Sequence, residues 1–115
     1  MRLLAVITLL VLALALVQPV AAQSFKPDYM AGLHAFDRKD YVTALAHLRD
    51  FAQQGYAQAQ FRLGVMYHLG LGVRKDPKAA IRWYRKAANH ITGAQFNLGT
   101  MYTSGEGVVQ DRVMS

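Results

Sequence analysis

The amino-acid sequence predicts an all-α fold, built as a short solenoid of antiparallel helix pairs. The first reason is an internal repeat: "AQFRLGVMYHLGLGVRKD" at residues 59–76 returns at residues 94–111 as "AQFNLGTMYTSGEGVVQD". The second reason is that small and apolar residues in each copy recur at steps of three and four, the period of a helix. The third is the pair of glycines that follows each periodic stretch. Helix pairs that bury their faces only against neighbouring pairs form a solenoid.

Five helices are expected, at residues 28–38, 41–54, 57–69, 77–89 and 92–103. Asp40 can cap the start of the second, and Asp76 the start of the fourth, where Pro77 occupies a first-turn position that needs no N–H donor. Asp111 would cap a further helix in the same way. Each copy of the repeat stops at glycines, which adopt the left-handed conformation of a sharp reversal without steric cost. These glycines are Gly70 and Gly72 in the first copy, and Gly105 and Gly107 in the second.

The stretch between the two copies repeats as well. "RKDYVTALAHLRDFA" at residues 38–52 aligns with "RKDPKAAIRWYRKAA" at residues 74–88, an offset of 36 residues. The first repeat has an offset of 35 residues, so one residue is deleted near Ile91. The unit is therefore a helix, a short turn, a second helix and a glycine-rich loop. Residues 23–111 form one repeat domain, with units at 28–56, 57–91 and, incomplete, 92–111; residues 112–115 are the truncated start of a further helix.

Three glycines lie inside the expected helices: Gly32, Gly64 and Gly99. A glycine there costs about 1 kcal/mol relative to alanine. Because glycine has no side chain, we expect the cost to be offset at each of these positions by another helix that packs closely against it. Leu63, Leu98, Tyr67 and Tyr102 are the larger side chains expected between the helices.

The residues of the repeat carry a family resemblance. The segment "AQFRLGVMYHLGLGVRKDPKAAIRWYRKAA" has small, glycine, aspartate and aromatic residues at the spacings of the Sel-one-like repeat, which it resembles. The structural motif residues are Gly64, Tyr67, Gly70, Gly72 and Asp76, then Gly99, Tyr102, Gly105, Gly107 and Asp111. This resemblance implies a right-handed superhelix, related to tetratricopeptide repeats, that binds other proteins or peptides, commonly as a scaffold or regulator in the bacterial envelope.

The first 22 residues have the pattern of a signal peptide. Arg2 precedes an apolar run at residues 3–17, and Val20 and Ala22 stand where a signal peptidase reads small residues. The alternative is a membrane anchor, but fifteen helical residues cover only about 22 Å of a hydrocarbon core of roughly 30 Å. We therefore expect cleavage after Ala22 and export to the periplasm or the exterior, with no stable membrane insertion afterwards. The chain has no cysteine, so packing alone must hold the exported domain together.

The sequence offers little for catalysis, and no enzyme activity, metal or cofactor is expected. No serine is followed three residues later by lysine, although an envelope enzyme or cell-wall-binding protein of the β-lactamase-like type remains the alternative function. The four histidines, His34, His47, His68 and His90, lack the spacing of metal ligands and are expected at the surface or at the edge of the core. Asp37, Asp50 and Glu106 have no obvious paired role.

The best functional candidate is a basic cluster around the fourth helix. Lys78, Arg82 and Arg85 share one helix face, which is either a solvated surface or a site for an acidic protein or peptide. Nucleic acid is not expected as a partner of an exported protein without a binding motif. The candidate contact residues are His47, Arg49, Arg82, Trp83, Arg85 and Lys86.

The C-terminal face of the repeat domain is expected to be incompletely covered. Its apolar residues are Phe96, Leu98, Met101, Tyr102 and Val108. Because each unit of a solenoid packs against the next, this face predicts either self-association or a chain that is the truncated product of a longer repeat protein.

Overall fold

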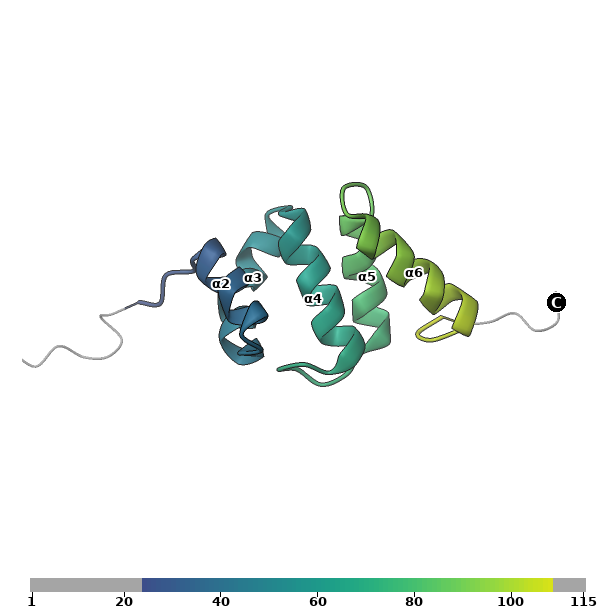
Figure 1. Cartoon of the computed structure of the whole chain (residues 1–115), viewed down its shortest axis with the longest axis horizontal. Coiled ribbons are helices and arrows are strands. Elements are labelled where there is room, and N and C mark those ends of the chain that lie inside the picture. Colours follow the sequence, from purple (N-terminus) through teal and green to yellow (C-terminus); the bar gives the residue numbers. More distant parts are fainter. Residues whose placement is uncertain (1–23, 109–115) are drawn as a thin grey trace, which may run out of the picture.

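The computed structural model describes residues 24–108, and within this range it contains five α-helices and no strand. The helices are α2 (Tyr29–Asp37), α3 (Tyr41–Gln53), α4 (Ala57–Leu69), α5 (Pro77–Ala87) and α6 (Thr92–Ser104). They lie in chain order along one line, and successive helices reverse direction (Figure 1). Each helix ends within two residues of its expected range, so the all-α prediction is confirmed. The expected signal peptide, Asp111 and the short helix at 112–115 lie outside the described residues.

Side-chain caps define where three of the helices begin. The Asp28 carboxylate accepts a hydrogen bond from Ala31 N–H at 3.0 Å, at the start of α2. Asp40 and Asp76 play the same part for α3 and α5, as the sequence predicts. These caps satisfy N–H groups that have no partner within the helix. None of the described helices is long and apolar enough to cross a membrane.

The glycine-rich loops make the same contact in each unit. Gly72 has φ 69° and Gly107 has φ 73°, both in the left-handed region that favours glycine. A Cβ on Gly72 would lie 2.8 Å from Tyr41 Cβ, and a Cβ on Gly107 would lie 2.8 Å from Pro77 Cβ. The loop after α4 therefore lies directly on the start of α3, and the loop after α6 lies directly on the start of α5. The predicted reversals at these glycines, and at Gly70 and Gly105, are confirmed.

The core consists of two clusters joined through α4. One lies between α2, α3 and α4, and the other between α4, α5 and α6. Alanine supplies four of the six residues of the first cluster and three of the six of the second, which lets the helices approach closely. Tyr84 is the largest fully buried side chain. The first cluster contains Ala35, Ala44, Leu48, Ala52, Ala59 and Leu63. The second contains Ala80, Ile81, Tyr84, Ala87, Ala94 and Met101.

Two of the three helical glycines mark close crossings, and one does not. A Cβ on Gly32 would lie 2.6 Å from Leu48 Cδ2, and a Cβ on Gly64 would lie 2.5 Å from the Tyr84 ring. The prediction is therefore confirmed at both positions. It is wrong for Gly99, where a Cβ would meet nothing within 4 Å. The reason is that Gly99 lies on the outer face of α6, the last helix of the described residues.

The C-terminal face is only partly open. Phe96 is 73% exposed and Tyr102 is 41% exposed, as expected for residues that no further described helix covers. Met101 contradicts the expectation, because it is fully buried in the second cluster. Leu98 and Val108 also pack against that cluster. The uncovered apolar surface of α6 is therefore narrower than the sequence suggests.

Candidate interaction surface

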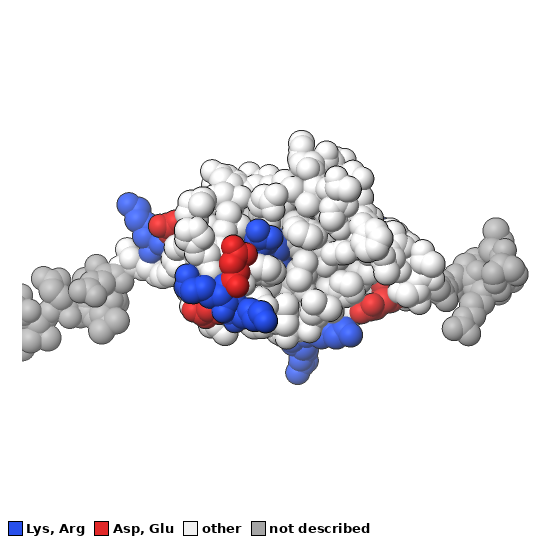
Figure 2. Space-filling model, viewed as in Figure 1, with Lys and Arg blue, Asp and Glu red and all other residues white. Residues whose placement is uncertain are grey.

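Charged residues are distributed unevenly over the molecule, whose formal net charge is +6. On the face drawn in Figure 2, charged atoms gather over α2 and α3 and along the lower edge, while the surface over α5 and α6 is mostly uncharged. The predicted contact residues on α5 must therefore be located from their individual contacts.

Three basic side chains of α5 line one groove. Lys78, Arg82 and Arg85 lie on the exposed side of the helix, because the opposite side buries Ala80, Tyr84 and Ala87. The groove has a volume of about 390 Å³ and is closed on its other side by the end of α6 and the loop that follows. We call it the basic groove; its lining residues are Lys78, Ile81, Arg82, Arg85, Tyr102, Gly107 and Val108.

Arg85 is held in place within the basic groove. Its guanidinium donates a hydrogen bond to the Tyr102 hydroxyl and lies 5.5 Å from the centroid of the same ring. A planar guanidinium can stack on an aromatic ring and still donate from its remaining N–H groups. One cation of the groove is thus oriented before any partner arrives.

The positive charge of the basic groove has no acidic partner among residues 24–108. Among the described residues, Glu106 forms an ion pair with Lys75 Nζ at 3.6 Å and also contacts His68 Nε2 at 3.3 Å. Three of the aspartates cap helices instead. Cations that line a groove without local counter-charges raise the positive potential there. The arrangement suits an anionic group.

The six predicted contact residues do not form one surface. Arg82 and Arg85 line the basic groove, but the other four lie elsewhere. Trp83 packs against the first core cluster, and Lys86 Nζ lies 4.8 Å from the centroid of its ring. On α5, Arg82 and Arg85 thus face the basic groove, whereas Trp83 and Lys86 do not. Helical spacing alone could not show which of them face the groove.

The two predicted contact residues on α3 are also separated from the groove. His47 Nδ1 accepts a hydrogen bond from Asp28 N–H at 3.0 Å, and its ring lies 4.8 Å from that of Phe25. His47 therefore holds the segment that precedes α2. Arg49 is exposed on α3.

A polar network that the sequence did not reveal lies beside the second cluster. The buried Tyr84 hydroxyl lies 3.2 Å from His68 Nδ1 and 3.4 Å from Asn97 Nδ2, and His68 in turn contacts Glu106. Burial raises the pKa of Tyr84 to about 12. His68 lies at the edge of the core, where its side chain is 19% exposed, and the expectation that Glu106 has no paired role is wrong. Each residue differs from its counterpart in the other copy, and this was the one available signal.

Ser104 Oγ donates to the Met101 carbonyl at 3.2 Å and accepts weakly from Glu106 N–H, so it serves the end of α6. No group of three histidine, aspartate or glutamate side chains within residues 24–108 is placed to hold a metal ion. In the polar network only the Tyr84 side chain is fully buried, whereas His68 and Glu106 are 19% and 35% exposed.

Two fungal proteins resemble this chain over about half of its length. It is 37% identical over 60 residues to chitin synthase regulatory factor 3 of Schizosaccharomyces pombe, covering 52% of this chain and 6% of that protein. It is 39% identical over 61 residues to the ERAD-associated E3 ubiquitin-protein ligase component HRD3 of Candida glabrata, covering 53% of this chain and 7% of that protein. The match thus spans less than a tenth of either relative.

Two solved structures share the fold. A Sel1 repeat protein from Oxalobacter formigenes superposes with a TM-score of 0.65 at 38% identity, covering 70% of this chain and 34% of that one. The protective antigen c5321 of uropathogenic Escherichia coli, which displays an SLR fold, superposes with a TM-score of 0.56 at 44% identity, covering 58% and 15%. The family model of the Sel1 repeat matches residues 57–90 and 92–115. The chain is an all-α solenoid and belongs to the Sel1 repeat family.

Proposed function

We propose that the chain is a protein-binding module without catalytic activity, and that the basic groove binds an acidic segment of a partner protein. The observation that carries this proposal is the presence of three cations on one groove, with no acidic side chain paired to them among residues 24–108. The names of the two relatives, a regulatory factor and a ligase component, suit proteins that act through other proteins.

The shape of the basic groove favours an extended acidic segment. Arg82 and Arg85 can each bind a carboxylate through two N–H groups, the strongest form of this hydrogen bond. Tyr102 and Val108 add an apolar wall against which a neighbouring side chain of the partner can pack. Positive potential also speeds the approach of an acidic partner.

Arg82→Gln is expected to weaken binding of an acidic peptide by about three- to tenfold, since one charge-assisted contact contributes roughly 0.6–1.4 kcal/mol at an accessible site. The probe is an eight-residue peptide of aspartate and glutamate with one central tyrosine, measured by calorimetry. Lys86→Gln is the matched control, because it removes the same charge from the same helix but outside the groove. Its affinity should stay within twofold of the original protein.

Equal loss in both variants would contradict the assignment to the groove, because it would mean that only the total charge matters. A neutral peptide of the same length should bind at least tenfold more weakly than the acidic one. Binding should also weaken as salt is raised from 50 to 300 mM, because mobile ions screen exposed charges.

The contacts of Ser104 do not favour the catalytic form of the alternative function, an envelope enzyme of the β-lactamase-like type. Ser104 bonds only to backbone atoms at the end of its helix, and neither contact is with a base that could activate it.

Export is part of the proposal. The pattern of residues 1–22 supports cleavage after Ala22, so the mature protein in a periplasmic or secreted fraction should begin at Gln23. N-terminal sequencing or intact mass measures this directly. Recovery of a chain that starts at Met1 in the membrane fraction would instead mean that the apolar segment is retained as an anchor.

A further inference from the structure

The Glu106 carboxylate is held beside the basic groove but outside it. Glu106 precedes Gly107, which lines the groove, yet it is not itself a lining residue. Its Oε2 lies 3.3 Å from His68 Nε2, and its Oε1 lies 3.6 Å from Lys75 Nζ. We call these two contacts the Glu106 clasp. The clasp keeps a negative charge away from a groove that is lined by three cations.

The backbone around Glu106 allows its carboxylate to leave the clasp. Gly105 and Gly107 flank it, with φ of 76° and 73°, and glycine adopts more backbone conformations than any other residue. Gly107 lies against Pro77, the residue before Lys78 of the basic groove. A carboxylate released from the clasp is therefore close to a cation of the groove.

The two contacts of the clasp differ in strength. The Lys75 side chain is 61% exposed, and an ion pair so open to water contributes little. The His68 side chain is only 19% exposed, and its other ring nitrogen, Nδ1, lies 3.2 Å from the Tyr84 hydroxyl. Because the imidazole is fixed at both nitrogens, His68 decides whether Glu106 stays in the clasp.

The charge of His68 depends on pH in the neutral range. The titratable groups that contact its ring are Tyr84 of α5 and the Glu106 carboxylate, and Lys75 reaches it only through Glu106. Helix α6 adds the uncharged amide of Asn97, which donates to the Tyr84 hydroxyl. A neutral imidazole can still donate to a carboxylate, but a protonated one also attracts it by charge. Histidines gain this charge between about pH 8 and 5, so acid strengthens the clasp.

The clasp is not part of the repeated packing. In the other copy of the repeat, Thr103 stands in place of His68 and Leu71 stands in place of Glu106. Neither of these side chains carries a charge, and the loop after α4 still packs on α3 through Gly72. The clasp is therefore not needed to hold such a loop, which leaves the position of the Glu106 charge as its effect.

We propose that Glu106 competes with the acidic partner for the cations of the basic groove, and that protonation of His68 favours the partner by holding Glu106 in the clasp. This inference rests on the function proposed for the groove and adds its regulation. Its consequence is that the partner binds more tightly as pH falls through the range in which histidine titrates.

The experiment measures binding of the tyrosine-containing acidic peptide by calorimetry at pH 6 and pH 8. The original protein should bind it about threefold more tightly at pH 6, since a partly exposed charge pair changes an equilibrium by only a small factor. The carboxylates of the peptide stay ionised at both pH values, and the lysines and arginines of the groove stay protonated. The difference therefore reports on histidine.

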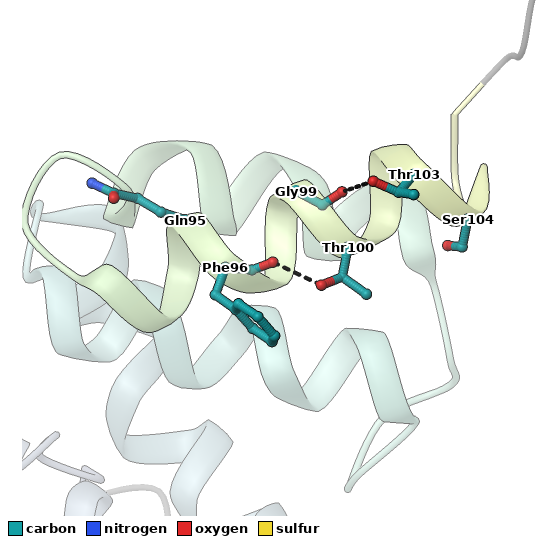
Figure 3. A pocket seen from close by; sticks show the side chains of 6 residues that line it. All are labelled: Gln95, Phe96, Gly99, Thr100, Thr103 and Ser104. Carbon is teal, nitrogen blue, oxygen red and sulfur yellow. Dashed lines mark hydrogen bonds between the residues drawn. The ribbon is translucent and has the colours of Figure 1, made fainter.

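A second hollow, along one side of α6, offers the acidic peptide no charge. Its volume is about 540 Å³, and Figure 3 shows the side chains that line it. None of them is charged, and the hydroxyls of Thr100 and Thr103 donate to backbone carbonyls of the same helix. Binding at this hollow would not depend on Arg82 or on pH, so it cannot imitate the expected result.

Two variants of the clasp should remove the pH dependence at opposite levels of affinity. His68→Gln keeps a polar side chain that never gains a charge, so its affinity should stay at the weaker level that the original protein shows at pH 8. Glu106→Gln removes the competing carboxylate, so its affinity should stay at least at the tighter level of pH 6. Circular dichroism checks that both variants are folded.

Matched controls account for charge and for other histidines. Asp50→Asn removes one negative charge from an exposed position of α3 and should keep the pH dependence. His90→Gln removes an exposed histidine before α6 and should keep it as well. If His68→Gln does not fold, the comparison of Glu106→Gln with Asp50→Asn decides the question.

Magnetic resonance of the protein without peptide tests the clasp separately from the proposed function. Between pH 6 and 8, the Val108 amide and the Arg82 Cζ signal should shift together with the ring of His68, and these shifts should be lost in Glu106→Gln. If Arg82→Gln leaves peptide binding unchanged, the groove is not the binding site, and the proposed function fails whatever these signals do.

Two results would overturn the inference while the proposed function stands. One is equal affinity of the original protein at pH 6 and pH 8, with binding that Arg82→Gln still weakens. The other is a Glu106→Gln variant that binds no more tightly at pH 8 than Asp50→Asn, because removal of the competitor would then have no effect of its own.

Discussion

Gly64→Ala should lower the free energy of unfolding by about 1–3 kcal/mol, although alanine is the better helix former. The added methyl group would lie 2.5 Å from the Tyr84 ring, which is closer than carbon atoms can approach. The ring cannot easily yield, because it is fully buried and its hydroxyl is held near His68 and Asn97. Either α4 and α5 move apart or the tyrosine leaves its place.

Gly99→Ala is the matched control for this substitution. It makes the same chemical change at the corresponding position of α6, where a Cβ would meet nothing within 4 Å. Here helix propensity alone should act, and stability should rise by about 0.5–1 kcal/mol. Urea denaturation of both variants measures the difference. An increase in stability for both would show that the α4–α5 crossing at Gly64 is not tight.

High pH should destabilise the fold through Tyr84. Burial raises its pKa to about 12, whereas the ordinary pKa of tyrosine, which the unfolded chain is expected to show, is 10.0. Between these values the unfolded state loses the phenolic proton first. The stabilisation is therefore complete below pH 10 and is lost as pH rises to 12, by about 2–3 kcal/mol in all.

Two phenylalanine variants separate this effect from general alkaline unfolding. Tyr84→Phe removes the group that titrates, so its stability should fall less steeply between pH 10 and 12 than that of the original protein. Tyr102→Phe removes a hydroxyl from a partly exposed tyrosine beside Arg85 and is the control for the loss of a tyrosine hydroxyl as such. Denaturant titrations at pH 9, 10, 11 and 12 give the slopes. Identical slopes for the original protein and Tyr84→Phe would contradict the role assigned to burial.

Local rules were sufficient to predict the fold. Helix starts follow from Asp40 and Asp76, and the reversals follow from glycines that adopt positive φ, because each depends only on a few neighbouring residues. The repeat then indicates which helices lie side by side. The repeat also led to the wrong prediction of a close helix crossing at Gly99. Gly99 and Gly64 occupy the same position in the repeat, but α5 packs against Gly64 and no described helix packs against Gly99.

The candidate site was predicted only in part, because side-chain partners come from other elements. Lys78, Arg82 and Arg85 share a helix face, and that much follows from helical spacing. The contact of Arg85 with Tyr102 joins residues 17 apart, and that of His68 with Glu106 joins residues 38 apart. No periodicity encodes such pairs. They depend on how α6 and its loop pack against α4 and α5.

The most direct test of the proposed function is to map where an acidic peptide binds on the protein. Backbone amide shifts, recorded by nuclear magnetic resonance during titration with the tyrosine-containing acidic peptide, report each residue separately. We predict that the largest changes lie at Lys78, Arg82, Arg85 and Val108, around the basic groove. Changes confined to α2 and α3, with α5 unaffected at saturation, would contradict the assignment of this groove as the protein-binding surface.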